Sequence, residues 1–381
     1  MQVYADNAAT TKVSRTAVEA MLPCFSEFYG NPSSLHQLGQ QAKGKLQKAR
    51  GMVASCIGCQ PREVYFTSGG TEADNQAILT GAMLGEKQGK KHVITTAFEH
   101  PAVLNTMKCL EARGFTVTYL PVDPLTHNIS AEQVKNALRQ DTCLVSAMYA
   151  NNEIGSILPI PRIGAVCRQA GVLLHVDAVQ AAGQIPVDVQ ADCIDFLSIS
   201  GHKFGGPKGV GALYARKDLN LNNLMNGGGQ ERGKRPGTEN LPGICGMAAA
   251  LEEACSQLAV RQTQVTAMRE KLRKGLSQIP DCLINGDQSH HLPGILNVCF
   301  PGTAGESLLV LLDSRGICAS AGSACSSGSL EPSHVLLAAG RSREEARSSL
   351  RLSLSRDNTM EEIDYLLEEI PKAVAQLRNC D

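Results

Sequence analysis

The feature that most constrains the fold is a recurring unit in which a short apolar strand is followed by polar residues and then by a helix. The sequence predicts strands at 63–67, 91–96, 116–120, 143–149, 172–177 and 196–199. Apolar strands of this length that alternate with helices are typical of a parallel sheet covered by helices. In such sheets, ligands bind beyond the carboxyl ends of the strands. We therefore expect an α/β fold whose functional residues gather at that edge.

The chain has 381 residues, which is long enough for two hydrophobic cores. We expect a large domain over 15–260. A smaller α+β domain is predicted from 1–14 and 261–381, and it includes a loop at about 319–333. One helix from about 244 to 273 is predicted to connect the two domains.

Composition excludes several classes of partner. The chain has 36 Lys and Arg against 37 Asp and Glu and lacks long basic runs, so neither nucleic acid nor an anionic membrane is expected as its partner. It has no apolar stretch of about 18 residues and no signal-like segment after Met1. We therefore expect a cytoplasmic protein.

A lysine and an acid stand at the ends of two apolar strands. Lys203 follows the strand at 196–199, and Asp177 ends the strand at 172–177. A lysine in an apolar pocket can form a Schiff base with an aldehyde cofactor. Pyridoxal phosphate chemistry needs such a lysine together with a carboxylate that keeps the pyridine nitrogen protonated. The alternatives are a solvated lysine in a glycine turn and an aspartate that caps the next helix.

Two further strand ends have residues that suit such a cofactor. Gly69 and Gly70 precede a helix, where backbone N–H groups favour a phosphate, and Thr71 adds a hydroxyl. His100 follows another strand and is fixed by Pro101, which places it well for stacking on a flat ring. Taken alone, each motif is equally typical of a turn or a loop.

Most of the fourteen cysteines lie in apolar contexts, which indicates small core residues rather than a disulfide framework. Cys56 and Cys59 have the spacing of a redox or metal motif, but no second such pair and no nearby His accompanies them. Cys325 differs because it lies among Gly, Ser and Ala, so its thiol is expected to be accessible and reactive. The alternative is an inert surface cysteine.

Two cationic features lie near the end of the chain. The glycine-rich loop at 227–240 lacks apolar residues and is expected to be an exposed excursion, either towards a partner subunit or into solvent. Arg351 alternates with Leu350 and Leu352 in a predicted strand, so it faces away from them. Its planar guanidinium suits a substrate carboxylate.

Ten motifs spread over essentially the whole chain carry a resemblance to a known family. They are DNAATT, GNPSSLH, FTSGGTEADN, EHPAV, NNEIG, HVDAVQ, SGHKFGGPKGVG, RPGTEN, SAGSACSSGSLEPSHV and RLSLSR. Together they resemble cysteine desulfurases of the NifS and IscS type, which belong to the class V aminotransferase family of pyridoxal phosphate enzymes. The resemblance implies a fold type I transferase, with a mostly parallel seven-stranded sheet and a smaller α+β domain.

The resemblance also implies roles for individual residues. Catalysis is assigned to Cys325 as sulfur acceptor, Lys203 as Schiff-base lysine and His100 as ring-stacking group. Asp177 pairs with the pyridine nitrogen and Gln180 bonds the ring oxygen. The cofactor phosphate is held by Gly70, Thr71, Ser200 and His202, and by Thr238 of a second subunit. Asn152 and Arg351 orient the substrate carboxylate.

The implied reaction converts L-cysteine to L-alanine and leaves the sulfur as a persulfide on Cys325. That sulfur would supply iron–sulfur cluster assembly or related sulfur trafficking. The resemblance implies a homodimer and a sulfur-accepting scaffold protein of the U type. It implies no resident metal, although Cys325 could ligate a cluster transiently. One departure is Ser326, where this loop commonly has Thr after the cysteine.

Three rival functions stay open on the sequence. A selenocysteine lyase shares nearly every residue named but needs no catalytic thiol. A plain aminotransferase of the same fold has no use for Cys325 and needs an oxo-acid. A sulfur carrier or scaffold would retain the cofactor site only as a vestige.

Overall fold

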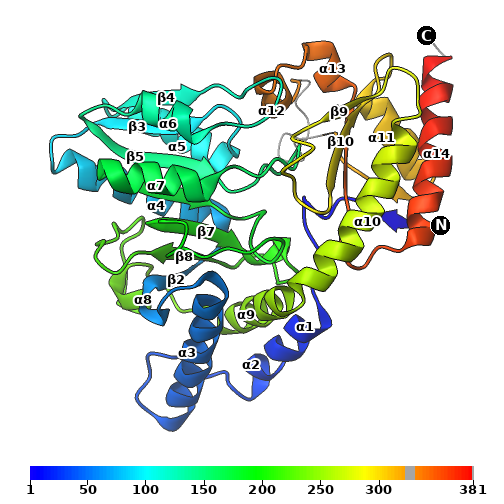
Figure 1. Ribbon diagram of the computed structural model, residues 1–381. Coiled ribbons are helices and arrows are strands. Elements are labelled where there is room, and N and C mark those ends of the chain that lie inside the picture. The colour runs from blue at the N-terminus through cyan, green and yellow to red at the C-terminus, as the bar shows by residue number, and fades with distance from the viewer. Residues whose placement is uncertain (322–330, 380–381) are drawn as a thin grey trace.

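The computed structural model describes residues 1–321 and 331–379, and its largest element is a seven-stranded sheet (Figure 1). Six strands are parallel, and β8 is antiparallel to both of its neighbours. In sheet order the strands are β2 (Val64–Thr67), β8 (Gly211–Ala215), β7 (Phe196–Ser200), β6 (Leu173–Asp177), β5 (Thr142–Met148), β3 (His92–Thr96) and β4 (Thr116–Leu120). The predicted α/β fold with a mostly parallel seven-stranded sheet is confirmed.

Helices cover both faces of this sheet because its central strands have apolar side chains on both faces. Phe196 and Leu213 pack with helix α4, whereas Leu197, Ile199 and Tyr214 join the main core on the other face. The helices and helical turns of this part are α1 (Arg15–Met21), α2 (Pro23–Ser26), α3 (Gln37–Ile57), η1 (Pro61–Glu63), α4 (Gly70–Glu86), α5 (Pro101–Glu111), α6 (Ala131–Ala137), α7 (Ile160–Ala170), η2 (Gly201–Lys203), α8 (Gln230–Gly233) and α9 (Leu241–Ser256). A strand buried on both faces explains why these runs are almost continuously apolar.

A second core lies beside a small antiparallel sheet in the order β12-β10-β9. Its buried residues are Val3, Ala5 and apolar side chains from Val265 onwards, so the start of the chain packs with its last third. The elements here are β1 (Val3–Tyr4), α10 (Leu258–Leu276), β9 (Leu283–Asn285), β10 (Ile295–Cys299), α11 (Gly305–Ser314), β11 (Ile317–Cys318), α12 (His334–Ala338), α13 (Arg343–Arg347), β12 (Ser349–Ser353) and α14 (Met360–Arg378). The exact domain boundaries stay a prediction.

The long connecting helix predicted from about 244 to 273 is wrong, because the segment forms two helices. Helix α9 ends at Ser256 and α10 begins at Leu258, with Gln257 between them in a non-helical conformation (φ −105°, ψ 9°). Figure 1 shows the two helices meeting at an angle. Helix α9 packs on α1 and α3, whereas α10 packs on α14 and β10. The change of packing partner causes the break, and helical periodicity does not reveal it.

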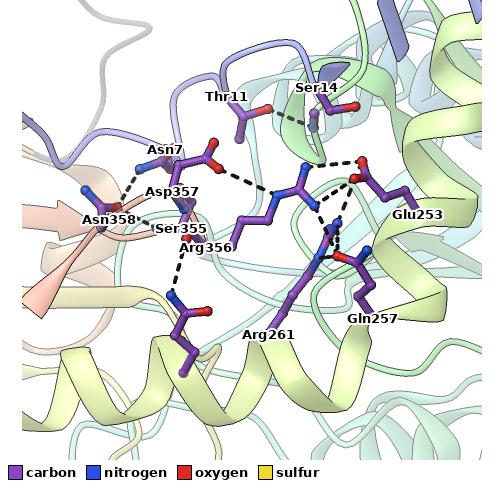
Figure 2. Close-up of polar contacts among 12 residues, drawn as sticks. Asn7, Thr11, Ser14, Glu253, Gln257, Arg261, Ser355, Arg356, Asp357 and Asn358 are labelled. Carbon is purple, nitrogen blue, oxygen red and sulfur yellow. Dashed lines mark hydrogen bonds and ion pairs between the residues drawn. The ribbon is translucent and has the colours of Figure 1, made fainter. Parts of the chain in front are cut away.

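A polar cluster fastens this break to the loop after β12. Figure 2 shows Arg356 reaching Glu253 and Gln257 from that loop, with Arg261 of α10 beside them. The Arg356 guanidinium donates to both Glu253 carboxylate oxygens, at 2.9 and 3.1 Å, and also to Gln257 Oε1. Arg261 donates to the same Gln257 oxygen at 3.0 Å. We call Glu253, Gln257, Arg261 and Arg356 the helix-break cluster.

The loop at 227–240 is only partly the exposed excursion that the sequence predicts. It contains the short helix α8, and within it Glu231 is buried. The Glu231 carboxylate accepts two hydrogen bonds from buried Arg50 of α3, at 2.6 and 2.8 Å, and a third from Phe66 N. The loop is therefore anchored from inside by a buried ion pair, while Thr238 near its end is exposed.

In the part of the chain that the structure describes, we find no helix both long and apolar enough to cross a membrane.

The first prediction concerns the buried ion pair. Arg50→Ala leaves the Glu231 carboxylate buried without its cation, so we expect the free energy of unfolding to fall by about 3–5 kcal/mol. Chemical denaturation followed by circular dichroism measures this loss. Arg15→Ala, which breaks the exposed pair with Glu19, is the matched control and is expected to leave the midpoint unchanged. A loss below about 1 kcal/mol for Arg50→Ala would show that the pair is not structurally important.

Candidate active site

A cavity of about 300 Å³ lies at the carboxyl ends of the large sheet's strands. Ten of the predicted site residues line it: Gly70, Thr71, His100, Asn152, Asp177, Gln180, Ser200, His202, Lys203 and Arg351. Parallel pairing explains this gathering, because β3, β5, β6 and β7 all end at the same edge. Thr238 is exposed and is not among the residues that line the cavity. Cys325 lies outside the described residues.

One end of the cavity suits a phosphate. Helix α4 begins at Gly70 directly after β2, so the positive end of its dipole lies at the cavity. A Cβ atom on Gly70 would lie 2.7 Å from Val179 Cγ2, so any larger residue there would displace the Val179 side chain. Ser200 and His202 line the same cavity, and burial lowers the pKa of His202 to about 4, with Lys203 and Lys208 adding to the effect. His202 is therefore a neutral hydrogen-bonding group at pH 7.

Lys203 and Gln180 contact the same N-terminal carbonyl. Lys203 Nζ donates to Ala8 O at 2.6 Å and to Ala9 O at 2.9 Å. Gln180 Nε2 also donates to Ala8 O, at 2.9 Å. The DNAATT segment thus forms one wall of the cavity, a role that the sequence analysis did not assign to it.

Asp177 is the acid of the cavity, and it lies in front of two more buried acids. Burial, together with the neighbouring Asp74 carboxyl, raises the pKa of Asp177 to about 6. Its Oδ1 accepts from Val179 N at 2.9 Å. Burial likewise raises the pKa of Asp74 to about 7 and that of Glu99 to about 8. A cationic ring nitrogen next to Asp177 would relieve this cost of ionisation. We call these three residues the buried acid group.

Neutral hydrogen-bonding side chains surround this group. Burial lowers the pKa of His175 to about 4, so its 3.5 Å contact with Asp74 is not an ion pair at pH 7. The His175 ring contacts Ser146 Oγ at 2.8 Å and Ser198 Oγ at 3.1 Å. His175 belongs to β6, the strand that ends in Asp177, and the two serines fix its ring from the neighbouring strands β5 and β7.

His100 occupies the N-cap position of α5 and lines the cavity. Its Nδ1 accepts a hydrogen bond from Ala102 N at 3.1 Å. Since Nδ1 is an acceptor, the proton of the neutral ring is on Nε2. The side chain is thereby held in one orientation and one tautomer.

Arg351 lies in the middle of β12 and is almost completely buried. Its guanidinium donates to Asp6 Oδ1 at 2.7 Å and to the Asn152 backbone carbonyl at 3.0 Å. Its Nε has no hydrogen-bond partner among the described residues. A buried guanidinium at the cavity with spare donor capacity suits an anionic group of a small ligand.

The sequence analysis missed three polar residues that also line the cavity, namely Asp74, Glu153 and His334. Glu153 is buried, which raises its pKa, and Ser333 Oγ donates to its carboxylate. His334 Nε2 contacts Glu99 O at 2.9 Å. These contacts tie the start of α12 to the ends of β3 and β5. Glu153 lies in the NNEIG motif, and Ser333 and His334 lie in the EPSHV end of another family motif. The residues around each motif do not indicate that the two segments meet in the fold.

The site fits the cofactor expected from the sequence on three separate observations: a side-chain-free helix start, a buried acid with a raised pKa, and a lysine within the same cavity. Sequence comparison agrees with this fit. The aminotransferase class-V family matches residues 3–366. The chain belongs to this family. Its cofactor is therefore pyridoxal 5′-phosphate, and the family predicted from the motifs is confirmed.

Several relatives are similar over almost the whole chain. "Cysteine desulfurase IscS" of Methanosarcina thermophila is 49% identical over 377 residues, which cover 99% of this chain and 93% of the relative. The protein of the same name from Clostridium botulinum is 48% identical over 380 residues and covers 99% and 95%.

Solved structures give the same result. A structure named "NifS-like protein" superposes with a TM-score of 0.92 at 41% identity and covers 99% of this chain and 100% of that one. A structure of "SspA in complex with cysteine" has a TM-score of 0.81 at 37% identity and covers 93% and 99%. The fold type I assignment is confirmed.

The raised pKa of Glu99 predicts a pH-dependent effect on stability. Between its usual pKa of 4.5 and the raised value of about 8, the folded chain keeps a proton that the unfolded chain releases. Wild-type stability therefore falls with rising pH in this window because of Glu99, and Glu99→Gln removes that loss. The amide keeps the acceptor for Thr96 and Met148. We expect the variant to gain stability relative to wild type as the pH rises from 4.5 to about 8.

Denaturant titrations of both proteins at pH 5, 6, 7 and 8 measure this difference. Glu132→Gln, at an exposed acid, controls for the change in net charge. A difference between Glu99→Gln and wild type that does not change with pH would contradict the assignment.

Proposed function

We propose that this chain is a cysteine desulfurase that converts L-cysteine to L-alanine and receives the sulfur as a persulfide on Cys325. The observation that carries the proposal is the single cavity lined by Lys203, Asp177, His100 and Arg351. Relatives at 48–49% identity over 99% of the chain are named cysteine desulfurases, which supports the same reaction.

The proposed cofactor contacts follow the shape of the cavity. Gly70, Thr71, Ser200 and His202 hold the phosphate at the start of α4. Asp177 pairs with the ring nitrogen, Gln180 bonds the ring oxygen, His100 stacks on the ring and Lys203 forms the Schiff base. When bound, the cofactor supplies an electron sink for the charge that the substrate carbon acquires on losing its proton.

Arg351 and Asn152 are proposed to orient the substrate. Arg351 offers a planar, always charged donor set that matches a carboxylate. Its ion pair with Asp6 keeps the guanidinium in place before substrate arrives. Fixing the carboxylate also fixes which bond at the α-carbon faces Lys203.

Lys203 and His100 are proposed to move the protons. Lys203 Nζ takes the proton from the substrate α-carbon, and the two backbone carbonyls of Ala8 and Ala9 hold that amine at the cavity wall. His100 bears its proton on Nε2, because Ala102 N occupies Nδ1, so Nε2 is the atom that exchanges a proton with substrate.

Sulfur transfer is proposed to use Cys325 as the nucleophile. Its thiolate attacks the substrate sulfur, so a new S–S bond forms while the substrate C–S bond breaks. The electron pair of the broken bond stays with the β-carbon, which takes up a proton and becomes the methyl group of alanine. Lys203 Nζ returns a proton to the α-carbon, which restores its C–H bond. A thiolate is required because it is far more nucleophilic than a thiol.

The test of this function is turnover of L-cysteine by the cofactor-loaded protein without reductant. We expect alanine, and a mass gain of one sulfur atom on the wild type. Cys325→Ala is expected to lose the adduct and at least about 100-fold of the alanine formation. Lys203→Ala is expected to lose both activity and the visible absorbance of the internally linked cofactor. Amino-acid analysis and intact-mass spectrometry give the two readouts.

The three rival functions predict different results in the same assay. A selenocysteine lyase releases alanine equally well from Cys325→Ala when selenocysteine is supplied. An aminotransferase turns over only with an oxo-acid. A carrier with a vestigial site shows neither the visible absorbance nor turnover.

A homodimer is proposed, with Thr238 of one subunit at the phosphate of the other. Thr238 is exposed, as are several large apolar side chains on the first three helices and in the segments between them. These are Val18, Leu22, Phe25, Tyr29, Leu35 and Leu38. Exposed apolar residues that lie close together in sequence support a protein contact at this part of the molecule.

Mixing two variants, each of which is inactive at low cofactor concentration, tests this arrangement. Thr238→Ala should bind cofactor about 10- to 100-fold more weakly, the cost of one hydrogen bond to a charged group. Lys203→Ala should be inactive. Hybrid dimers of the two contain one complete site, so we expect activity at low cofactor concentration to return on mixing. Failure of the mixture to exceed its components would place Thr238 in its own subunit's site or outside the site.

We propose a cytoplasmic location. The twelve described cysteines are all free thiols, which fits a reducing compartment.

We also propose a scaffold protein of the U type as sulfur acceptor, which supplies iron–sulfur assembly. Docking is proposed near residues 321–330. Deleting that segment should abolish co-purification with the scaffold, whereas the full chain retains it; unchanged capture would contradict docking there.

A further inference from the structure

A second cavity contains two thiols that the proposed reaction does not use. It measures about 160 Å³ and lies between the last turns of α3 and α9, which pack against each other. Cys56 comes from α3 and Cys255 from α9, and both are half-buried. The other residues that line the cavity are almost all apolar: Ile57, Ala182, Gly183, Ile185, Pro186, Val187, Leu251 and Leu258.

The two thiols contact each other directly. A side-chain hydrogen bond links Cys56 and Cys255, which line the same cavity. The neighbour in the CxxC motif, Cys59, does not line this cavity. The fold therefore pairs Cys56 with a cysteine 199 positions away and not with the one three positions away.

The environment gives the two sulfurs different roles. The hydrogen bond with Cys56 lowers the pKa of Cys255, and Arg261 and the backbone N–H of Gly183 lower it further, although burial opposes them. The pKa of Cys56 is raised by the same hydrogen bond and by burial. Cys255 is thus the sulfur of the pair that ionises more readily. A reactive thiolate with a second thiol in contact is the arrangement of a disulfide-forming pair.

Metal binding suits this cavity less well. Residues 1–321 and 331–379 contain no group of three or more His, Cys, Asp or Glu side chains able to hold a metal ion. Two thiols in an apolar cavity do not provide the four ligands of a structural zinc site.

We propose that Cys56 and Cys255 form a reversible disulfide when the enzyme meets a peroxide. The Cys255 thiolate attacks one oxygen of hydrogen peroxide, the O–O bond breaks, and the leaving hydroxide takes a proton to become water. Cys255 is then a sulfenic acid. The Cys56 sulfur displaces its hydroxyl group, which leaves as a second water with the Cys56 proton. Two electrons pass from the two sulfurs to the peroxide, and a dithiol reductant reverses the change.

The thiol pair lies close to the break between α9 and α10, where the two parts of the chain meet. Arg261, the cation near Cys255, belongs to the helix-break cluster that binds the loop after β12 (Figure 2). Disulfide formation removes the thiol whose ionised form Arg261 stabilises. It also joins α3 covalently to α9 just before the break at Gln257. Oxidation of the thiol pair therefore changes contacts at the junction of the two parts of the chain.

The test treats cofactor-loaded protein carrying Cys325→Ser with hydrogen peroxide, so that the proposed catalytic thiol does not compete. We expect intact mass to fall by about 2 Da, because two hydrogens are lost, and dithiothreitol to restore it. Non-reducing peptide mapping should find the Cys56 and Cys255 peptides linked. The thermal unfolding midpoint of the oxidised protein should rise, since the cross-link restricts the unfolded chain.

Cys24 and Cys245 supply a matched control, because they form another hydrogen-bonded thiol pair in which the pKa of Cys245 is raised to about 12. Cys24→Ser should leave the cross-link intact, whereas Cys56→Ser and Cys255→Ser should each abolish it. Peptide mapping of the protein with both cysteines present does not depend on how well these variants fold. A linkage between other cysteines, or oxygen addition to Cys255 without a linkage, would overturn the proposal.

Discussion

The cavity depends on one short N-terminal segment that bridges the two sheets. Ala8 O accepts from Lys203 on the large-sheet side, while Ala8 N donates to Ser353 Oγ of β12. Two residues earlier, Asp6 holds Arg351. A hydrogen bond from a charged group contributes about 1.5–3 kcal/mol, so these contacts fix Lys203 and Arg351 relative to each other. The shape of the cavity thus depends on backbone atoms of this segment as well as on side chains.

The buried acid group costs the folded chain free energy, because its carboxyl groups are removed from water. Three carboxyls lie close together at the cavity, two of them in its lining, and burial raises the pKa of each. A stable empty cavity would favour apolar residues there. The acids make sense when a cation approaches Asp177, because the same burial that penalises its charge strengthens its attraction to that cation.

The sequence was sufficient for the features that depend on local patterns. Apolar runs located the strands, and the polar residues at strand ends, together with the family resemblance, indicated the ten predicted residues that line the cavity. It was insufficient where a role arises from a distant partner. The Glu153 carboxylate is bound by Ser333, which is 180 positions away. Helix α9 ends where its packing partner changes, and Cys56 meets Cys255 only in the folded chain. Cys325 was singled out by its neighbours in sequence, and its placement lies outside the described residues.

The ion pair between Arg50 and Glu231 has a consequence beyond stability. Glu231 and Arg232 have left-handed backbone conformations, with φ of 46° and 58°, which non-glycine residues seldom adopt without support. The buried carboxylate holds them there from beneath. A surface that binds a partner usually loses conformational entropy as its loops become ordered. Here the ordering accompanies folding of the single chain, so the loop would not pay this entropy again on contact with another molecule.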